Sequence, residues 1–87
     1  MTDANIRLLL AGVEGELARA QNSFPPFHTA HEGYAVLLEE VDELWAHVKV
    51  KQGRRNVGAM RSEAIQVAAM ALRFALDLCE DEERGQR

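Results

Sequence analysis

The residues HTAHEGYAVLLEEVDELW, at positions 28–45, carry the strongest helix signal in this chain. They open with Thr29 and Glu32, a T-x-x-E capping box of the kind that starts a helix. Apolar side chains then recur with a 3.6-residue period, which predicts an amphipathic helix over residues 29–51. The apolar positions are Tyr34, Leu37, Leu38, Val41, Leu44, Trp45 and Val48. Four carboxylates, Glu39, Glu40, Asp42 and Glu43, lie within this pattern and need an explanation.

Two further helices are expected on either side of this segment. Residues 1–22 carry an apolar face built on Ile6, Leu9, Leu10, Val13 and Leu17, with a start signal at Thr2 or Asp3. Residues 57–80 form the third predicted helix, and 81–87 read as a polar, frayed tail. The intervening SFPPFH, residues 23–28, is a stiff loop because paired prolines exclude helix. Its two phenylalanines either close the end of the core or contact a ligand.

Length and composition bound the fold and its surroundings. Eighty-seven residues make a single domain, spanning 1–87, with a net charge of −4 and a pI of about 5.3. An acidic chain is not expected to bind nucleic-acid polymers, which select basic surfaces. No apolar run is long enough to span a membrane. One cysteine and no apolar leader favour a reducing, cytoplasmic location.

The third predicted helix is apolar around most of its circumference, which two helices of so short a chain can hardly cover. A small domain without disulfides also gains stability from association. We therefore predict an all-α, three-helix antiparallel chain that forms a helical bundle by homo-oligomerisation.

The carboxylates fall on defined faces of the predicted helices. Glu40 and Glu43 are i,i+3 neighbours and project from one strip of the second helix, whereas Asp42 points elsewhere and reads as a solvated charge. Glu63 and Gln66 have the same spacing on the third helix. Two antiparallel helices would bring these strips together. Oxygen donors without histidine or cysteine suit a hard ion, so the pattern predicts Mg²⁺ or Mn²⁺. Clustered glutamates are also common on solvated faces.

These motifs resemble those of the MazG-like, all-α nucleotide pyrophosphohydrolases, whose pattern is E-E-x-x-E, a spacer, and E-x-x-D. Here EEVDE (39–43) is followed after 19 residues by EAIQ (63–66), and the similarity covers roughly residues 28–79. The resemblance implies Mg²⁺-dependent cleavage of a nucleoside triphosphate to its monophosphate and pyrophosphate, by a homodimer or dimer of dimers. It implies Glu40, Glu43 and Glu63 as metal ligands and Glu39 as a carboxylate that either binds a further ion or orients water. Gln66 replaces the family's aspartate. Its amide oxygen can still be a ligand for a hard cation but brings no negative charge.

Further candidate residues lie at the ends of the second helix. His28, His31, Lys49, Arg54 and Arg61 are candidates for substrate binding, with ordinary surface positions as the alternative. His47 is either a proton carrier or a surface histidine. Because of Gln66, the alternative to an enzyme is a non-catalytic helical interaction or nucleotide-binding module with a degenerate metal site. A purely structural helical dimer is a third interpretation.

Overall fold

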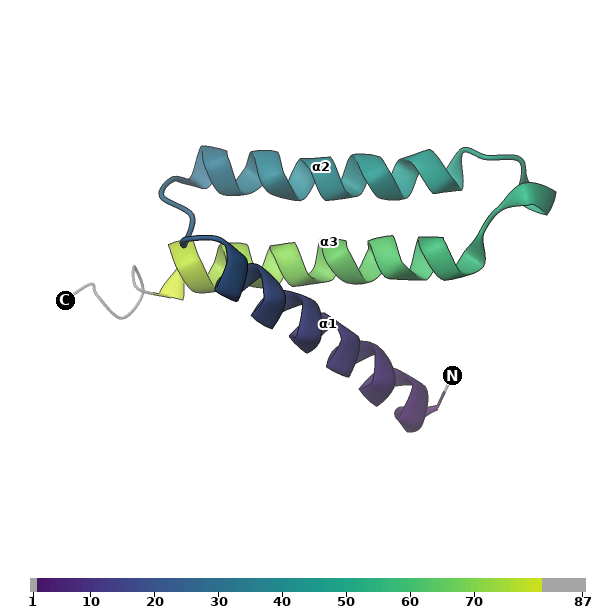
Figure 1. Cartoon of the computed structure of the whole chain (residues 1–87), viewed down its shortest axis with the longest axis horizontal. Coiled ribbons are helices and arrows are strands. Elements are labelled where there is room, and N and C mark those ends of the chain that lie inside the picture. Colours follow the sequence, from purple (N-terminus) through teal and green to yellow (C-terminus); the bar gives the residue numbers. More distant parts are fainter. Residues whose placement is uncertain (1, 81–87) are drawn as a thin grey trace.

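The computed structural model describes residues 2–80, and every regular element in that range is helical (Figure 1). The elements are α1 (Asp3–Ser23), α2 (Ala30–Val48), a short 3-10 helix (Gln52–Arg54) and α3 (Val57–Leu78). The predicted all-α class is thus confirmed. The predicted frayed tail, 81–87, lies outside the described residues.

Side-chain caps begin all three α-helices. Thr2, Thr29 and Asn56 each accept a hydrogen bond from the backbone amide three residues later, at 3.2, 3.0 and 3.0 Å. Each bond satisfies an amide that has no partner within its helix. In the predicted capping box, Glu32 Oε1 accepts from the amide of His28 at 2.7 Å, one residue before the cap. This bond ties the proline loop to the start of α2.

The second helix ends earlier than predicted. We expected residues 29–51, but α2 ends at Val48 and the chain turns through the 3-10 helix. Arg55 Nε donates to the carbonyl oxygens of Val48 and Val50, at 3.0 and 3.1 Å. The guanidinium therefore donates hydrogen bonds to carbonyl groups that have no partner at the end of the helix. The periodicity of α2 could not reveal this contact, since it comes from beyond the turn.

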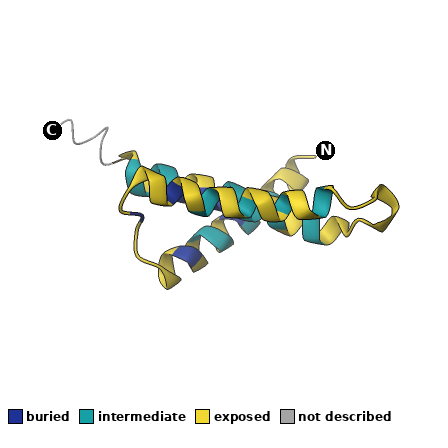
Figure 2. Cartoon of the chain, turned by 90° about the horizontal axis from the view of Figure 1, so that it is seen from above, coloured by how far each residue is buried: buried dark blue, intermediate teal, exposed yellow. Residues whose placement is uncertain are grey.

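Helix α3 lies at the centre of the fold. It runs antiparallel to α2, and α1 crosses it at an angle on the side away from α2 (Figure 1). The buried core is small and consists of Val13, Ala20, Ala69 and Met70, with half-buried residues such as Leu37 packed around it. Much of the surface of the helices remains exposed (Figure 2). The radius of gyration, 14.8 Å, exceeds the ~12 Å expected of a compact domain of this length.

The centre of the apolar stripe of α2 is exposed in the single chain. Tyr34 and Trp45 are 60% and 56% exposed, and Leu38 and Val41 are exposed as well. Helix α3 packs instead against a neighbouring strip of α2 that includes Gly33 and Val36. Leu72 and Leu76 are exposed on α3. Within residues 2–80, no helix is both long and apolar enough to cross a membrane.

Gly33 allows α2 and α3 to approach closely, and its replacement by alanine is expected to destabilise the protein. A Cβ atom there would lie 2.7 Å from Phe74 Cδ2 and 3.0 Å from Leu78 Cδ1. The resulting overpacking costs about 1–3 kcal/mol, which outweighs the ~1 kcal/mol that alanine gains in a helix. Urea denaturation of Gly33→Ala measures the net effect.

Gly15→Ala is the matched control, because a Cβ at Gly15 meets nothing within 4 Å. Alanine should therefore stabilise α1 by about 1 kcal/mol. Equal stabilisation by the two substitutions would contradict the close contact of Gly33 with Phe74.

Candidate metal centre

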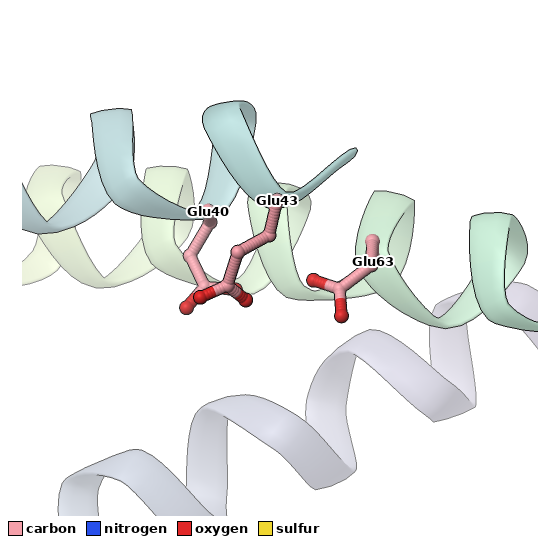
Figure 3. Close-up of side chains that lie close together, drawn as sticks. All are labelled: Glu40, Glu43 and Glu63. Atoms are coloured by element: carbon pink, nitrogen blue, oxygen red, sulfur yellow. The ribbon is translucent and has the colours of Figure 1, made fainter. Parts of the chain in front are cut away.

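Three carboxylates from two helices converge beside the α2–α3 contact. Glu40 and Glu43 project from α2 and Glu63 from α3, and one oxygen of each lies within 4.8 Å of those of the other two. In Figure 3 the three carboxylate groups gather on the side of the α2–α3 pair along which α1 passes. The antiparallel pairing produces this cluster, since it sets residues near the end of α2 beside residues near the start of α3.

Proximity and burial make this cluster electrostatically unfavourable. The pKa of Glu40 is raised above its ordinary value, first by burial and then by the negative charges of Glu43, Glu63 and Glu39. The pKa of Glu63 is raised by burial and by the adjacent carboxylate of Glu43, whereas nearby His47 lowers it. Burial and like charges both disfavour ionised carboxylates. A bound cation would offset both effects.

The oxygen atoms suit a hard divalent cation. Glu63 Oε2 is buried and has no hydrogen-bond partner among the described residues, an arrangement that normally calls for an explanation such as an ion. Two oxygens on opposite sides of one Mg²⁺ lie about 4.2 Å apart, since Mg–O distances are about 2.0–2.1 Å. Only one pair of the three oxygens can lie opposite each other in an octahedral site, and neighbouring ligands lie about 3 Å apart. The oxygens, which lie within 4.8 Å of one another, would therefore draw closer on binding the ion. The donor set therefore fits Mg²⁺ or Mn²⁺.

A cleft of about 520 Å³ begins at this cluster and extends toward the proline loop. Its volume is in the range typical of small-molecule sites. Glu40 lines the cleft and also belongs to the carboxylate cluster, so the two are continuous. Glu39, which is exposed, lines the same wall. The cleft can thus present a ligand directly to the carboxylates.

Gln66 lines the cleft but points to α1. Its Nε2 donates to Glu16 Oε2 at 2.6 Å, and Glu16 also accepts from Arg19. Glu16 adds to the negative charges that raise the pKa of Glu40. The position at which the resemblance implies an aspartate is therefore occupied by an amide hydrogen-bonded to a carboxylate of another helix. The Gln66 side-chain oxygen as a ligand stays a prediction.

The residues predicted to bind substrate do not line the cleft. His28, His31, Lys49, Arg54 and Arg61 are all exposed. The last three lie around the α2–α3 turn, at the end of the hairpin nearer Glu43 and Glu63. Their contact with a nucleotide stays a prediction. Asp42 is exposed on α2, in keeping with the expected solvated charge.

Two cleft residues were not assigned a role from the sequence, Glu16 and Arg73. Glu16 follows Val13 by three residues and precedes Ala20 by four, so it flanks the buried face of α1. That spacing was the available signal. Arg73 is buried at 5% exposure, and the sequence gives no signal for a buried arginine there.

Comparison of the chain with protein-family models, curated proteins and solved structures gives no match. The functional argument consequently depends on the carboxylate cluster, the cleft and the motif spacing.

The raised pKa values predict how the metal-free protein responds to pH. Between the ordinary glutamate pKa of about 4.5 and the raised values, the folded protein binds more protons than the unfolded chain. The contribution of Glu40 and Glu63 to the free energy of unfolding therefore falls as pH rises through this interval. Relative to wild type, Glu63→Gln should become progressively more stabilising as the pH rises from 4.5 through the raised pKa of Glu63.

Urea denaturation of both proteins across this range, with a chelator present, measures that difference. Asp42→Asn removes a carboxylate from the exposed side of α2 and serves as the control. A stability difference between Glu63→Gln and wild type that is independent of pH would contradict the proposed repulsion.

Proposed function

We propose that this protein is a Mg²⁺-dependent nucleotide pyrophosphohydrolase that converts a nucleoside triphosphate to its monophosphate and pyrophosphate. The observation that carries the proposal is the convergence of Glu40, Glu43 and Glu63, with Glu63 Oε2 unpartnered among the described residues, beside a ligand-sized cleft that Glu40 lines. Phosphate chains are a natural ligand for such a site, because Mg²⁺ keeps open positions for phosphate oxygens. The resemblance of the two acidic motifs to the MazG-like family supports the same reaction.

In the proposed reaction the carboxylates have two different roles, metal binding and proton transfer. Glu40, Glu43 and Glu63 would hold the ion, which when bound supplies a Lewis acid for the phosphate oxygens. Glu39 stands on the same wall of the cleft and would orient a water molecule and accept its proton. Water attacks the α-phosphorus, the bond from this atom to the α,β-bridging oxygen breaks, and pyrophosphate leaves. His47, close enough to lower the pKa of Glu63, is placed to tune the charge of the cluster.

A pyrophosphate-release assay over a panel of nucleoside triphosphates, with Mg²⁺ or Mn²⁺, tests this reaction. We expect equal amounts of monophosphate and pyrophosphate, none of either with a chelator, and a large loss of rate for Glu39→Gln. Release of orthophosphate instead, or no turnover at saturating metal, would overturn the proposal.

We also propose that the working form is a homodimer or a dimer of dimers. The stripe of Tyr34, Leu38, Val41 and Trp45 is exposed in a chain whose own core is small. At 100° per residue it lies on the side of α2 opposite Glu39 and Glu43, so a second copy packed there leaves the carboxylates accessible. Contiguous exposed apolar surface of this kind marks interaction sites.

Light scattering coupled to size exclusion tests the association. Trp45→Lys is expected to shift the wild-type oligomer toward the monomer, since it sets a charge in the apolar stripe. Ala46→Lys adds the same charge to the neighbouring exposed position on another face of α2 and should leave the oligomer intact. A monomeric wild-type protein would refute the association.

The alternative function is a non-catalytic nucleotide-binding or interaction module, and the contact of Gln66 with Glu16 favours it. This hydrogen bond turns the Gln66 amino group to Glu16, and glutamine in place of aspartate leaves one carboxylate fewer for metal than the family pattern has. Gln66→Asp separates the two functions by its effect on Mn²⁺ affinity and turnover. A gain in both supports a degenerate site, whereas a loss or no change supports an active site adapted to glutamine.

A further inference from the structure

The cleft has two chemically different ends. Its carboxylate end contains Glu16, Glu39, Glu40 and Gln66. Its other end is closed by the proline loop and lined by Phe24, Pro25, Phe27, Met70 and Arg73. Positions along α3 show how far apart the two ends are. Gln66 at the carboxylate end and Arg73 at the aromatic end are seven residues apart, or about 10 Å. Glu63 is ten residues from Arg73, about 15 Å. The cleft therefore separates a site for cations from an aromatic site.

Arg73 is the buried cation of this aromatic end, which Glu32 also lines. Its guanidinium carbon lies 3.9 Å from the centre of the Phe27 ring and 5.7 Å from that of Phe24. Nη2 donates to the carbonyl oxygen of Pro25 at 2.9 Å, and Nε lies 3.6 Å from Asp77 Oδ2. Among residues 2–80, the hydrogen bond from Nη1 goes to the sulfur of Met70, at 3.8 Å. Sulfur is a weak acceptor, so Nη1 retains donor capacity in a residue that lines the cleft.

Phe24 offers a flat apolar surface at the same end. Its side chain lines the cleft and is 60% exposed, whereas Phe27, three residues later, is buried beneath Arg73. The two phenylalanines of the loop therefore differ in role. Phe27 closes the core, as one of the two sequence interpretations holds, and Phe24 remains free to contact a ligand. Aromatic rings exposed in a cleft stack readily on planar ligands.

We propose that the aromatic end of the cleft is a nucleobase subsite, in which the base stacks on Phe24 and a carbonyl oxygen of the base accepts a hydrogen bond from Arg73 Nη1. The identification of the planar ligand as a nucleotide rests on the proposed function. A base in this position points its sugar and phosphates along the cleft toward Glu40. Asp77 neutralises the charge of Arg73, which makes this end more suitable for a neutral planar group than for a phosphate.

The donor chemistry of Arg73 selects among the bases. A guanidinium presents only donors. Guanine offers paired acceptors, O6 and N7, and thymine and uracil offer O4, whereas adenine sets an amino donor beside its N7 acceptor. The subsite therefore favours guanine, thymine or uracil over adenine.

The subsite can be tested without catalysis by titrating the metal-free protein with nucleosides. Binding is measured from changes in the NMR signals of the backbone amides and the arginine guanidinium groups. Guanosine, thymidine and uridine are expected to shift the Phe24 and Arg73 signals and to bind several-fold more tightly than adenosine. Phe24→Ala should weaken binding by on the order of tenfold, the size of a stacking contribution. Phe24→Trp should retain it. Leu8→Ala removes an exposed apolar side chain outside the cleft and should change nothing.

The outcomes separate this subsite from the proposed hydrolase. Nucleoside binding that depends on Phe24, in a protein that releases no pyrophosphate, would retain the subsite and remove the enzyme. Pyrophosphate release that is insensitive to Phe24→Ala, with no nucleoside binding, would remove the subsite and retain the enzyme. Equal affinity for adenosine, or displacement of guanosine from the Arg73 signals by inorganic triphosphate without metal, would overturn the role of Arg73.

Discussion

Replacing Glu40 by glutamine is expected to weaken Mg²⁺ binding strongly and, in the absence of metal, to raise the free energy of unfolding. The pKa of Glu40 is raised by burial and by the charges of four other carboxylates, those of Glu43, Glu63, Glu39 and Glu16. Glutamine keeps the size of the side chain and one acceptor oxygen but removes the charge. The loss in metal affinity should be on the order of 100-fold or more, since even residues that only support ligands contribute 10- to 100-fold.

Most substitutions at half-buried positions lower the free energy of unfolding, whereas Glu40→Gln is expected to raise it. Removing one of several neighbouring like charges should add a few tenths of a kcal/mol for each exposed pair relieved. Calorimetric titration with Mg²⁺ or Mn²⁺ measures the first effect, and urea denaturation with a chelator measures the second. The combination excludes misfolding as the cause of lost metal binding.

Asp42→Asn is the control for both measurements. It removes the same charge from the same helix, two residues away, at an exposed position outside the cluster and the cleft. Metal affinity should remain at the wild-type value. Unchanged metal affinity in Glu40→Gln, or an equal loss in Asp42→Asn, would mean that the carboxylates form an ordinary solvated face.

The sequence was sufficient to predict the helices and the convergence of three carboxylates. Helical periodicity assigns Glu40 and Glu43 to one strip, and the short turn between α2 and α3 leaves an antiparallel arrangement as the simplest way to bring Glu63 beside them. The caps at Thr29 and Asn56 involve contacts three residues apart, which local sequence encodes. Because these features depend on residues close in the sequence or joined by a short turn, they could be predicted from the sequence.

Features that depend on the direction of α1 and on the path of the proline loop could not be predicted from the sequence. Gln66 pairs with Glu16 across 50 residues of sequence, and Arg73 contacts Pro25 across 48. Periodicity identifies the faces of a helix but does not say which helix will meet them. The apolar stripe of α2 that contains Tyr34 and Val41 illustrates this limit. The sequence predicts the stripe, but it does not reveal that α3 packs beside the stripe and leaves these two side chains exposed.

Arg73→Leu is the substitution expected to destabilise the protein most. The guanidinium is buried against Phe27, bonds the Pro25 carbonyl and faces Asp77, whose side chain is 12% exposed. Asp77 in turn accepts from the amide of Phe27 at 3.0 Å. Leucine fills part of the space but leaves a buried carboxylate without its cation and a carbonyl without its donor. Breaking a buried pair in this way costs about 3–5 kcal/mol, a large share of the stability of any small domain.

Urea denaturation of Arg73→Leu measures this loss, with Arg61→Leu as the control on the same helix. Arg61 is exposed, so its replacement should change the free energy of unfolding by no more than about 0.5 kcal/mol. Similar effects of the two substitutions would show that Arg73 does not hold the proline loop against α3.

A double-mutant cycle with Asp77→Asn then separates the charge interaction from the packing of Arg73. Asparagine keeps an oxygen that can accept from the Phe27 amide but removes the negative charge, so Asp77→Asn alone leaves the buried guanidinium uncompensated. In Arg73→Leu/Asp77→Asn no buried charge remains. The double variant should therefore lose less stability than the sum of the single variants, by about 1–3 kcal/mol. Additive losses would mean that Arg73 acts through Phe27 and Pro25 alone, in which case the guanidinium keeps its full charge at the aromatic end of the cleft and would attract a phosphate there in preference to a base.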